Sequence, residues 1–357
     1  MDASPTPRHP VFCTVVPPHL LERIARSQDS RRADLAQRTL ERDAALRTRR
    51  RMTTVRGVAS ALGAPVSDEP DRTVHDAGHG TRLPGRKVRG EGDPASQDAS
   101  VNRAYAGLGA TFELFLKGFG RRSIDDAGLA LDATVHYGED YNNAFWDGRQ
   151  MVFGDGDGDL FLDFTVSLDV IGHELAHGVT QYTANLDYYQ QSGALNESMS
   201  DVFGSLIKQY SLEQTAEEAD WLIGAGLLGP AVSGVALRSM KAPGTAYDDD
   251  ELGKDPQPAT MDDYVRTSRD NGGVHINSGI PNHAFYLAAT ELGGKAWERA
   301  GQIWYDTLTG GELAPDADFA DFARLSTAAA VTRYGDGGAE HRALQKAWST
   351  VGVPPAG

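Results

Sequence analysis

The chain has 357 residues, of which 40% are hydrophobic and 24% charged; this is ordinary for a globular protein and long enough for two lobes. A single cysteine, Cys13, excludes an internal disulfide. The net charge of −16 is uneven: residues 1–64 carry 12 Arg and 6 acids, whereas residues 65–357 carry 22 basic and 44 acidic residues. We expect the basic N-terminal segment, called the head below, to dock on the acidic remainder rather than on nucleic acid; the alternative is a solvated basic helix.

The sequence contains no evident targeting or membrane-spanning segment. The apolar run 11–16 ends at Pro17 and is shorter than the roughly 7–15 apolar residues of a secretory signal. The uncharged stretch 221–237 contains four Gly and Pro230 and is shorter than the roughly 20 residues of a membrane span. We therefore expect no membrane association, and buried loops at residues 221–237.

In chain order, residues 20–51 have a helical apolar pattern without Pro or Gly, and residues 57–70 have the composition of a linker. Residues 72–158 alternate short Val, Phe and Tyr runs with turn residues, which predicts a β-rich lobe with one helix near 102–118. From Ser167 onward the spacing becomes helical, for example at 297–308 and 319–330. The pattern predicts an α+β fold with three parts: head and linker 1–64, β-rich lobe 65–166 and helical lobe 167–357.

The clearest chemical motif is His173-Glu174-Leu175-Ala176-His177, which matches H-E-x-x-H. On a helix, residues i and i+4 lie one above the other, so both imidazoles can reach one ion. Apolar residues at 171, 175, 179 and 182 indicate such a helix, and His173 lies about 200° around it from Ile171. The alternative is two histidines on a helix surface without a metal.

A second helix is predicted after the turn at Ser192 and Gly193, and it supplies a third ligand. Catalytic zinc takes three protein ligands and keeps one position open. Glu197 lies off the apolar stripe of this helix, and Asp201 follows one turn later on the same face. A carboxylate there could accept the outer N–H of a ligating histidine. The alternative is that Glu197 and Asp201 are plain surface acids.

Four blocks within residues 72–357 stand out in combination: Asn142-Asn143-Ala144-Phe145-Trp146, the helix at 169–182, residues 193–201, and Asp270-Asn271-Gly272-Gly273-Val274-His275-Ile276-Asn277-Ser278-Gly279. They resemble the thermolysin-like family of neutral zinc metallopeptidases, and the short head resembles its protealysin-type subgroup. The resemblance implies a two-lobed peptidase with the zinc helix at the floor of the cleft. It also implies one catalytic zinc, protein or peptide substrates and a monomer. Relatives are commonly outside the cell, so secretion is implied despite the missing signal, with a cytoplasmic location as the alternative.

The resemblance also implies roles for individual residues. His173, His177 and Glu197 match the zinc ligands, with Asp201 and Asn196 behind them. Glu174 resembles the general base that takes a proton from zinc-bound water. His275 resembles the donor to the developing oxyanion, assisted by Tyr188 and oriented by Asp270.

Substrate-binding residues follow from the same resemblance. Asn143 and the backbone of Ala144 match groups that align a substrate strand, and Arg238 matches the residue that grips a substrate carbonyl. A pocket for the bulky apolar side chain just after the cut bond is matched by Phe161, Phe164, Val170 and Leu237. The alternative for these four is ordinary core.

Two acidic clusters raise the question of calcium. Asp169 and Asp220 match the family's calcium ligands, but Lys208, Leu222 and Ala225 stand where acids are expected. We therefore expect the double calcium site to be lost, while some calcium binding stays open. The spacing of Asp155, Asp157 and Asp159 imitates the opening of an EF-hand loop. The bidentate Glu is missing, so we interpret this run as a turn.

Cys13 lies in the Pro-flanked segment Phe12-Cys13-Thr14-Val15-Val16-Pro17-Pro18, which we expect to be extended. Such a segment could lie in the cleft like a substrate, with the thiolate in the open zinc position, so that the head inhibits the precursor. The alternative is an idle thiol. Residues 47–51 and the linker after them are the predicted processing sites. Two other functions are disfavoured. A catalytically silent binding or regulatory protein would have a broken site, yet the ligands, base and oxyanion donors are all present. A structural zinc domain would close the fourth ligand position with Cys or His, and only the removable head offers such a residue.

Overall fold

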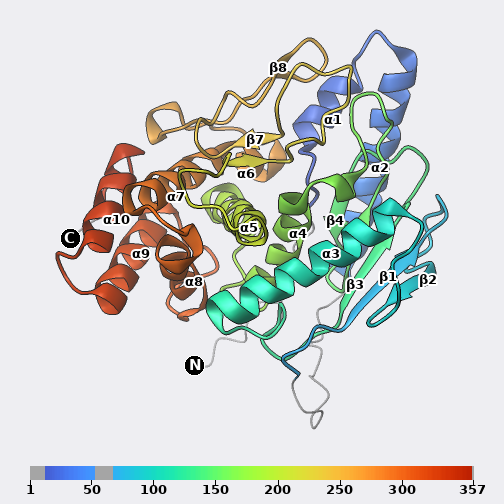
Figure 1. Ribbon diagram of the computed structural model, residues 1–357. Helices are drawn as coiled ribbons and strands as arrows, with labels where there is room; N and C mark the ends of the chain where they lie inside the picture. The colour runs from blue at the N-terminus through green and yellow to red at the C-terminus, as the bar shows by residue number, and fades with distance from the viewer. Residues whose placement is uncertain (1–12, 53–66, 356–357) are drawn as a thin grey trace, which may run out of the picture.

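The computed structural model describes residues 13–52 and 67–355 (Figure 1). Its mixed sheet has the strand order β2-β1-β3-β5-β4, with β1, β3 and β5 parallel and β2 and β4 antiparallel to their neighbours. The strands are β1 (Arg72–Asp76), β2 (Arg86–Gly90), β3 (Leu131–Val135), β4 (Ala144–Trp146) and β5 (Gln150–Phe153). Because β4 is an edge strand, one side of its backbone is available to another extended segment.

One long helix, α3 (Ala99–Glu113), crosses the sheet and packs on β1, β3 and α4 (Figure 1). The Asp98 carboxylate caps its first turn by accepting hydrogen bonds from the backbone N–H groups of Ser100 and Val101. The helix continues as a wider turn, η1 (Leu114–Gly118). The helix predicted near residues 102–118 is confirmed.

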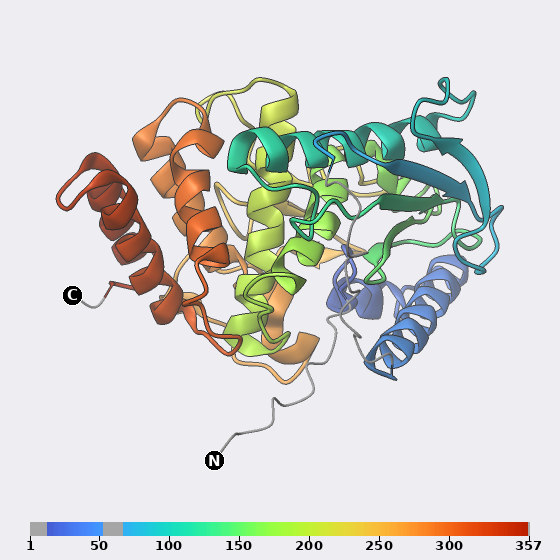
Figure 2. The same ribbon diagram turned by 90° about the horizontal axis from the view of Figure 1, so that it is seen from below.

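Two helices, α4 (Leu168–Gln181) and α5 (Gln190–Ser211), run through the centre of the molecule between the sheet and the C-terminal helices (Figure 2). Their backbones touch, because a Cβ on Gly204 would lie 2.4 Å from the carbonyl oxygen of Asp169. A Cβ on Gly172 would lie 3.1 Å from the Cα of Gly204. Glycine at both positions thus sets the close spacing of the two helices that carry the metal motif.

The C-terminal part is helical. Its helices are α6 (Asp270–Asn277), α7 (Gly279–Leu292), α8 (Ala300–Thr309), α9 (Phe319–Tyr334) and α10 (Ala339–Thr350). Short elements complete it: β6 (Leu222–Ile223) with β7 (Arg238–Ser239), β8 (Asp248–Asp249) with β9 (Gly253–Lys254), and the 3-10 turns η2 (Phe164–Val166), η3 (Met261–Asp263) and η4 (Ala296–Glu298). A β-containing part followed by a helical part confirms the predicted α+β fold of two lobes.

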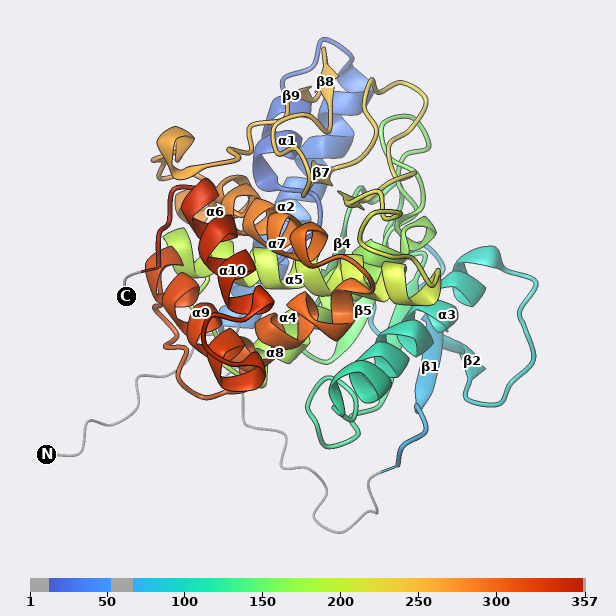
Figure 3. The same ribbon diagram turned by 60° about the vertical axis from the view of Figure 1, so that its left-hand side comes forward.

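The head forms two helices, α1 (Pro18–Ile24) and α2 (Ser30–Met52), so the prediction of a single helical stretch at 20–51 is wrong at residues 25–29, where the helix is interrupted. The chain turns at Asp29, whose carboxylate accepts hydrogen bonds from the backbone N–H groups of Arg31 and Arg32 and starts α2 anew. Figure 3 shows α1 beside β8 and β9. The predicted processing stretch 47–51 lies in the last turns of α2, and most of the linker, residues 53–66, lies outside the described residues.

A single large cluster of buried side chains extends through both lobes and includes Val15, Val16, Leu20, Leu21 and Ile24 of the head. Residues 221–237 form β6 and the loop before β7. Trp221 and Leu237 at its ends lie inside the core, but the middle of the loop is exposed, with Val235 60% exposed, so the prediction of buried loops is only partly correct. None of the described helices combines the length and hydropathy that a bilayer span requires.

Candidate active site

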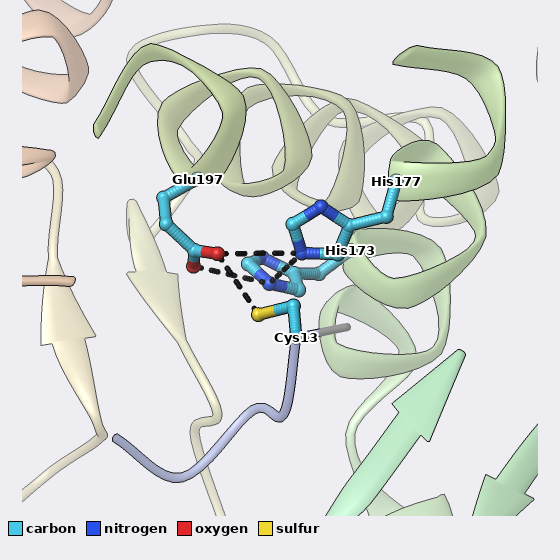
Figure 4. A group of neighbouring side chains, drawn as sticks. All are labelled: Cys13, His173, His177 and Glu197. Atoms are coloured by element: carbon cyan, nitrogen blue, oxygen red, sulfur yellow. Dashed lines mark hydrogen bonds and ion pairs between the residues drawn. The ribbon is translucent and has the colours of Figure 1, made fainter. Parts of the chain in front are cut away.

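Four donor atoms from three elements converge at one buried point, all within 4.8 Å of one another (Figure 4). His173 and His177 project from α4, Glu197 from α5 and Cys13 from the head. The two imidazole Nε2 atoms are 3.1 Å apart, and the carboxylate of Glu197 lies 3.6 Å from His173 and 3.5 Å from His177. These separations are close to the roughly 3.3 Å edges of a tetrahedron with zinc–nitrogen bonds of about 2.0–2.1 Å. Oxygen Oε2 of Glu197 is buried without a hydrogen-bond partner, which fits a metal ligand.

Each candidate histidine ligand is held from behind. The Nδ1 atom of His173 lies 2.8 Å from Asp201, and that of His177 lies 2.8 Å from the side-chain oxygen of Asn196. Both rings therefore present Nε2 to the common point. The two residues that the resemblance placed behind the ligands, Asp201 and Asn196, occupy those positions.

Asp201 also connects the histidine to β7 and α7. Arg238 donates to both of its oxygens, over 2.8 and 2.9 Å, and Asn282 donates to Oδ2 over 2.8 Å. Burial favours the neutral acid, but the charges of Arg238 and His173 outweigh it and hold the pKa of Asp201 well below its usual range. Asn282 was not found from the sequence, because its position on α7 carries no motif.

The second residue of the motif, Glu174, is fully buried beside this point. Its Oε2 accepts a hydrogen bond of 2.9 Å from the backbone N–H of Trp146 on β4, while Oε1 is buried without a partner. Burial, and then the negative charge of Glu197, raise the pKa of Glu174 well above its usual value. One oxygen is thus fixed and the other is free to take a proton, a geometry suited to a general base.

His275 and Tyr188 lie beside the same cluster, where both contact the Cys13 sulfur. The Nδ1 atom of His275 lies 2.5 Å from Asp270, which also accepts the backbone N–H of His275 over 2.9 Å. Burial opposes a charged ring, but the carboxylate of Asp270 outweighs it and raises the pKa of His275. The Tyr188 hydroxyl lies 3.2 Å from Nε2 of His275, so two donors point to one place.

A tight turn positions Asp270 beneath His275. Within α6 the residues Asn271, Gly272 and Gly273 all have positive φ, at 48°, 87° and 82°, and regular helix begins only at Val274. Two glycines in succession allow this left-handed turn at low cost. The Asp-Asn-Gly-Gly sequence before His275 is the local signal of this geometry.

Residues 13–16 of the head lie along β4 as an added strand, with Thr14 paired to Phe145 in antiparallel fashion. The backbone N–H of Val15 donates to the carbonyl of Ala144 over 3.1 Å, and Arg238 donates to the carbonyl of Val15 over 3.3 Å. Asn143 binds Val16 twice, accepting its N–H over 2.9 Å and donating to its carbonyl over 3.4 Å. Asn143, Ala144 and Arg238, which the resemblance implies as substrate-binding, all contact this strand.

At the end of this strand, the Cys13 sulfur lies 2.9 Å from Glu197 and 3.5 Å from Nε2 of His275, and it accepts the Tyr188 hydroxyl over 2.9 Å. Burial, and then the charges of Glu197 and Glu174, raise the pKa of the Cys13 thiol well above its usual value. Without a cation the thiol therefore keeps its proton, and a bound metal would favour the thiolate.

The four residues predicted as a side-chain pocket are buried in the main core together with Val15: Phe161, Phe164, Val170 and Leu237. The rings of Phe161 and Phe164 are 6.1 Å apart. This apolar setting is compatible with both interpretations, a pocket and ordinary core.

The two acidic clusters form ion pairs and hydrogen bonds with other residues of the protein. Lys208 places its ammonium 3.0 Å from Asp169 and 2.8 Å from Asp220, between the two acids that match calcium ligands. In the second cluster, Asp157 accepts three backbone N–H groups of its own turn. Its neighbours Asp155 and Asp159 bind His136 and Arg32 instead. The three acids do not converge, in agreement with a turn.

Comparisons with known proteins agree with this geometry. Sequence profiles described as thermolysin metallopeptidase, catalytic domain, and thermolysin metallopeptidase, alpha-helical domain, match residues 67–181 and 184–353. An extracellular metalloprotease of Pectobacterium carotovorum subsp. carotovorum is 52% identical over 96% of both chains. Protease PrtS of Photorhabdus sp. strain Az29 is 48% identical over 95% of this chain and 91% of its own length.

A solved structure is also similar: the precursor of protealysin, a metalloproteinase from Serratia proteamaculans, has a TM-score of 0.86 and 52% identity, covering 96% of this chain and 99% of that one. Fold and metal-binding cluster thus define a metallopeptidase. The chain belongs to the thermolysin family of metalloendopeptidases, in which catalytic zinc is implied, and it is of the protealysin type.

Proposed function

We propose that this protein is a zinc endopeptidase made as a self-inhibited precursor, which cuts on the amino side of bulky hydrophobic residues. The observation that carries the proposal is the convergence of His173, His177 and Glu197 beside Glu174, whose one oxygen is free. In the fourth position stands Cys13, from a segment that lies in the cleft like a substrate.

The residues divide the reaction among themselves. His173, His177 and Glu197 would hold the zinc ion, which when bound would supply a Lewis acid for the substrate carbonyl and the attacking water. Glu174 takes the proton of the attacking water at Oε1, because Oε2 is occupied by the Trp146 N–H. His275, oriented by Asp270, and Tyr188 donate to the oxygen on which negative charge develops; one such donor is typically worth about 10²–10³ in rate.

The alignment of substrate follows the hydrogen bonds of the head strand. Asn143 and Ala144 would bind the backbone of a substrate added to β4, and Arg238 would hold the carbonyl after the cut bond, as it holds Val15. In this register Val15 takes the place of the residue just after the cut bond. Val15 is fully buried and belongs to the same extended core as Phe161, Phe164, Val170 and Leu237, which is compatible with the proposed preference for a hydrophobic side chain there.

Inhibition by the head is supported by two contacts at the site. The Cys13 sulfur fills the space that attacking water needs, and the strand after it uses the hydrogen bonds of a substrate. We assign the inhibitory part to residues 1–64, the β-rich lobe to 65–166 and the helical lobe to 167–357. The active enzyme is proposed to be monomeric. Secretion is supported by the extracellular metalloproteases among its relatives.

Calcium is proposed to play no part at the Asp169–Asp220 position. The Lys208 ammonium already neutralises both acids there, and calcium prefers six to eight oxygen ligands. The positive charge of Lys208 therefore stands where a calcium ion would otherwise neutralise Asp169 and Asp220.

The proposal is tested by incubating the purified full chain with casein, with and without a zinc chelator, and following the head by mass spectrometry. Proteolysis and head removal should both stop with chelator. Glu174→Gln should lower proteolysis by about 10²–10⁴-fold, while Glu312→Gln, which removes an exposed charge between α8 and α9, should not. If Glu174→Gln digests casein at the normal rate, the assigned chemistry is wrong. If a folded, zinc-loaded wild-type chain cuts nothing, the alternative of a silent binding protein is favoured.

A further inference from the structure

Two arginines of the head bind a surface that lies outside the cleft. Arg32 donates to Asp159 over 2.8 Å and to the side chain of Glu251 over 3.2 Å. Arg23 donates to two backbone carbonyls, that of Glu251 over 3.1 Å and that of Asp250 over 3.0 Å. We call this surface the acidic seat and define it as the side chains of Asp159 and Glu251 with the carbonyl oxygens of Asp250 and Glu251.

The acceptors of the acidic seat are held by the catalytic lobes themselves. Asp157 accepts the backbone N–H of Asp159 over 2.9 Å and so fixes its turn. Asp249 accepts the N–H of Glu251 over 2.8 Å and fixes the β8–β9 hairpin. Neither contact involves the head, so the two turns that carry the acceptors would keep their backbone conformation after the head has left.

We propose that the acidic seat is a secondary substrate-binding site, which takes an arginine from the part of a protein substrate that follows the cut bond. The inference rests on the proposed function, because the head must leave before a substrate can replace it. The head itself is the observed occupant: its two guanidinium groups already use all four acceptors.

The path from the cleft to the acidic seat limits where that arginine stands. In the head, Val16 is bound by Asn143, and α1 begins two residues later. At about 1.5 Å per residue, α1 carries the chain no more than roughly 10 Å to Arg23. An extended substrate, at about 3.3 Å per residue, covers that distance in about three residues. Arg23 and Arg32 both contact Glu251, so the distance to Arg23 also approximates the distance to the carboxylates of the seat. With Val15 in the place of the first residue after the cut bond, the arginine should stand roughly four to seven residues after that bond.

The geometry of the seat favours arginine over lysine. The planar guanidinium of Arg32 reaches two carboxylates that come from different loops, and that of Arg23 reaches two carbonyls of neighbouring residues. Forked donors of this kind suit paired acceptors, whereas an ammonium acts as a point charge. The excess of acidic residues in 65–357 also favours binding of positively charged substrate segments.

The test uses the self-processed enzyme and fluorogenic peptides with one cleavable bond and arginine placed at each of positions three to eight after it. Each arginine peptide is paired with its citrulline analogue, which has the same shape without the charge. We expect arginine at the favoured position to lower KM by roughly 3–10-fold with little change in kcat, the size of one or two exposed ion pairs. High salt should remove the difference.

The decisive variant is Asp159→Asn with Glu251→Gln, compared after head removal because the change also weakens docking of the head. It should lose the arginine preference and cut a short peptide without the extension as fast as wild type; Glu312→Gln should keep the preference. Equal KM for arginine and citrulline peptides, or a preference that survives in the double variant, would overturn the proposal. If the processed wild-type enzyme fails to cut even the short peptide, the proposed function is overturned as well.

Discussion

The carboxyl group of Asp43, on α2 of the head, accepts a hydrogen bond of 3.0 Å from the side-chain amide of Asn143 in the cleft. It also accepts the hydroxyl of Tyr141 over 2.5 Å and is only 4% exposed. Burial raises the pKa of Asp43 to about 7. The hydrogen bonds from Tyr141 and Asn143 and the charges of Arg47 and Arg42 act in the opposite direction but are outweighed. Because Asn143 also binds Val16, this head carboxyl contacts a residue that positions the inhibitory strand.

This contact predicts that docking of the head weakens as pH rises. The docked state favours protonated Asp43, whereas the undocked carboxyl has a pKa near 4, so docking takes up a proton between about pH 4 and 7. Docking free energy should fall across this window and level off above pH 7. The measured quantity is the rate of head removal divided by the rate of peptide cleavage by processed enzyme at the same pH. This ratio should therefore increase from about pH 5 to 7. Asp43→Asn should flatten this ratio; parallel profiles for variant and wild type would contradict the prediction.

A second pH effect is expected in the β-rich lobe, at His136. Its ring lies 2.8 Å from Asp155 and 2.7 Å from Asp98, and these hydrogen bonds raise its pKa to about 9. Since the folded pKa lies above the unfolded value of about 6.5, the stabilisation is complete below pH 6.5 and is lost as pH rises through 9. Urea midpoints between about pH 6 and 10 should show this loss in wild type and not in His136→Asn.

The control for that measurement is His79→Asn. Both histidines have positive φ, 61° and 55° for His79 and His136, and asparagine tolerates this conformation. The His79 side chain is 62% exposed and lies 3.3 Å from Asp155; because exposed ion pairs contribute little, its replacement should change the pH dependence of the urea midpoint much less than His136→Asn does. An equal effect of the two variants would show that the His136 contacts do not carry the dependence.

Lys208→Met should destabilise the fold strongly. It leaves Asp169, 1% exposed, without its charged partner, and breaking such a buried pair costs about 3–5 kcal/mol. The matched change Lys346→Met breaks an exposed pair with Glu291 and should cost at most about 1 kcal/mol. Urea unfolding measures both. Added calcium should not raise the melting temperature of wild type; a clear rise would show that the ion binds despite Lys208.

Cys13→Ser should shorten the latency of the full chain, because a hydroxyl is a far weaker zinc ligand than a thiolate. Time courses of head removal by mass spectrometry, at equal protein concentration, measure the effect. Thr14→Ser, a conservative change at the next buried position of the same strand, serves as the control and should keep wild-type latency. Unchanged latency in Cys13→Ser would leave inhibition to the hydrogen bonds of the strand alone.

Local patterns in the sequence were enough for the helices that carry the site. Spacings of three and four residues predicted α4 and α5, and motif spacing placed the histidines on one face. Contacts between distant residues were out of reach: Asp43 and Asn143 are 100 positions apart, and Arg32 and Asp159 are 127. The break between α1 and α2 was missed for a related reason, since Ser27 within the break and Arg32 after it both bind the distant Glu251.

The close approach of α4 and α5 at Gly172 and Gly204 has a consequence for the loss and rebinding of the metal. Because the two helices also share the buried core, their spacing does not depend on the ion alone, and we expect the ligand side chains to stay together after demetallation. Zinc added back should restore activity within the time of diffusion, without a refolding step. Any movement that admits substrate would then occur in the lobes around α4 and α5, while these two helices keep their spacing.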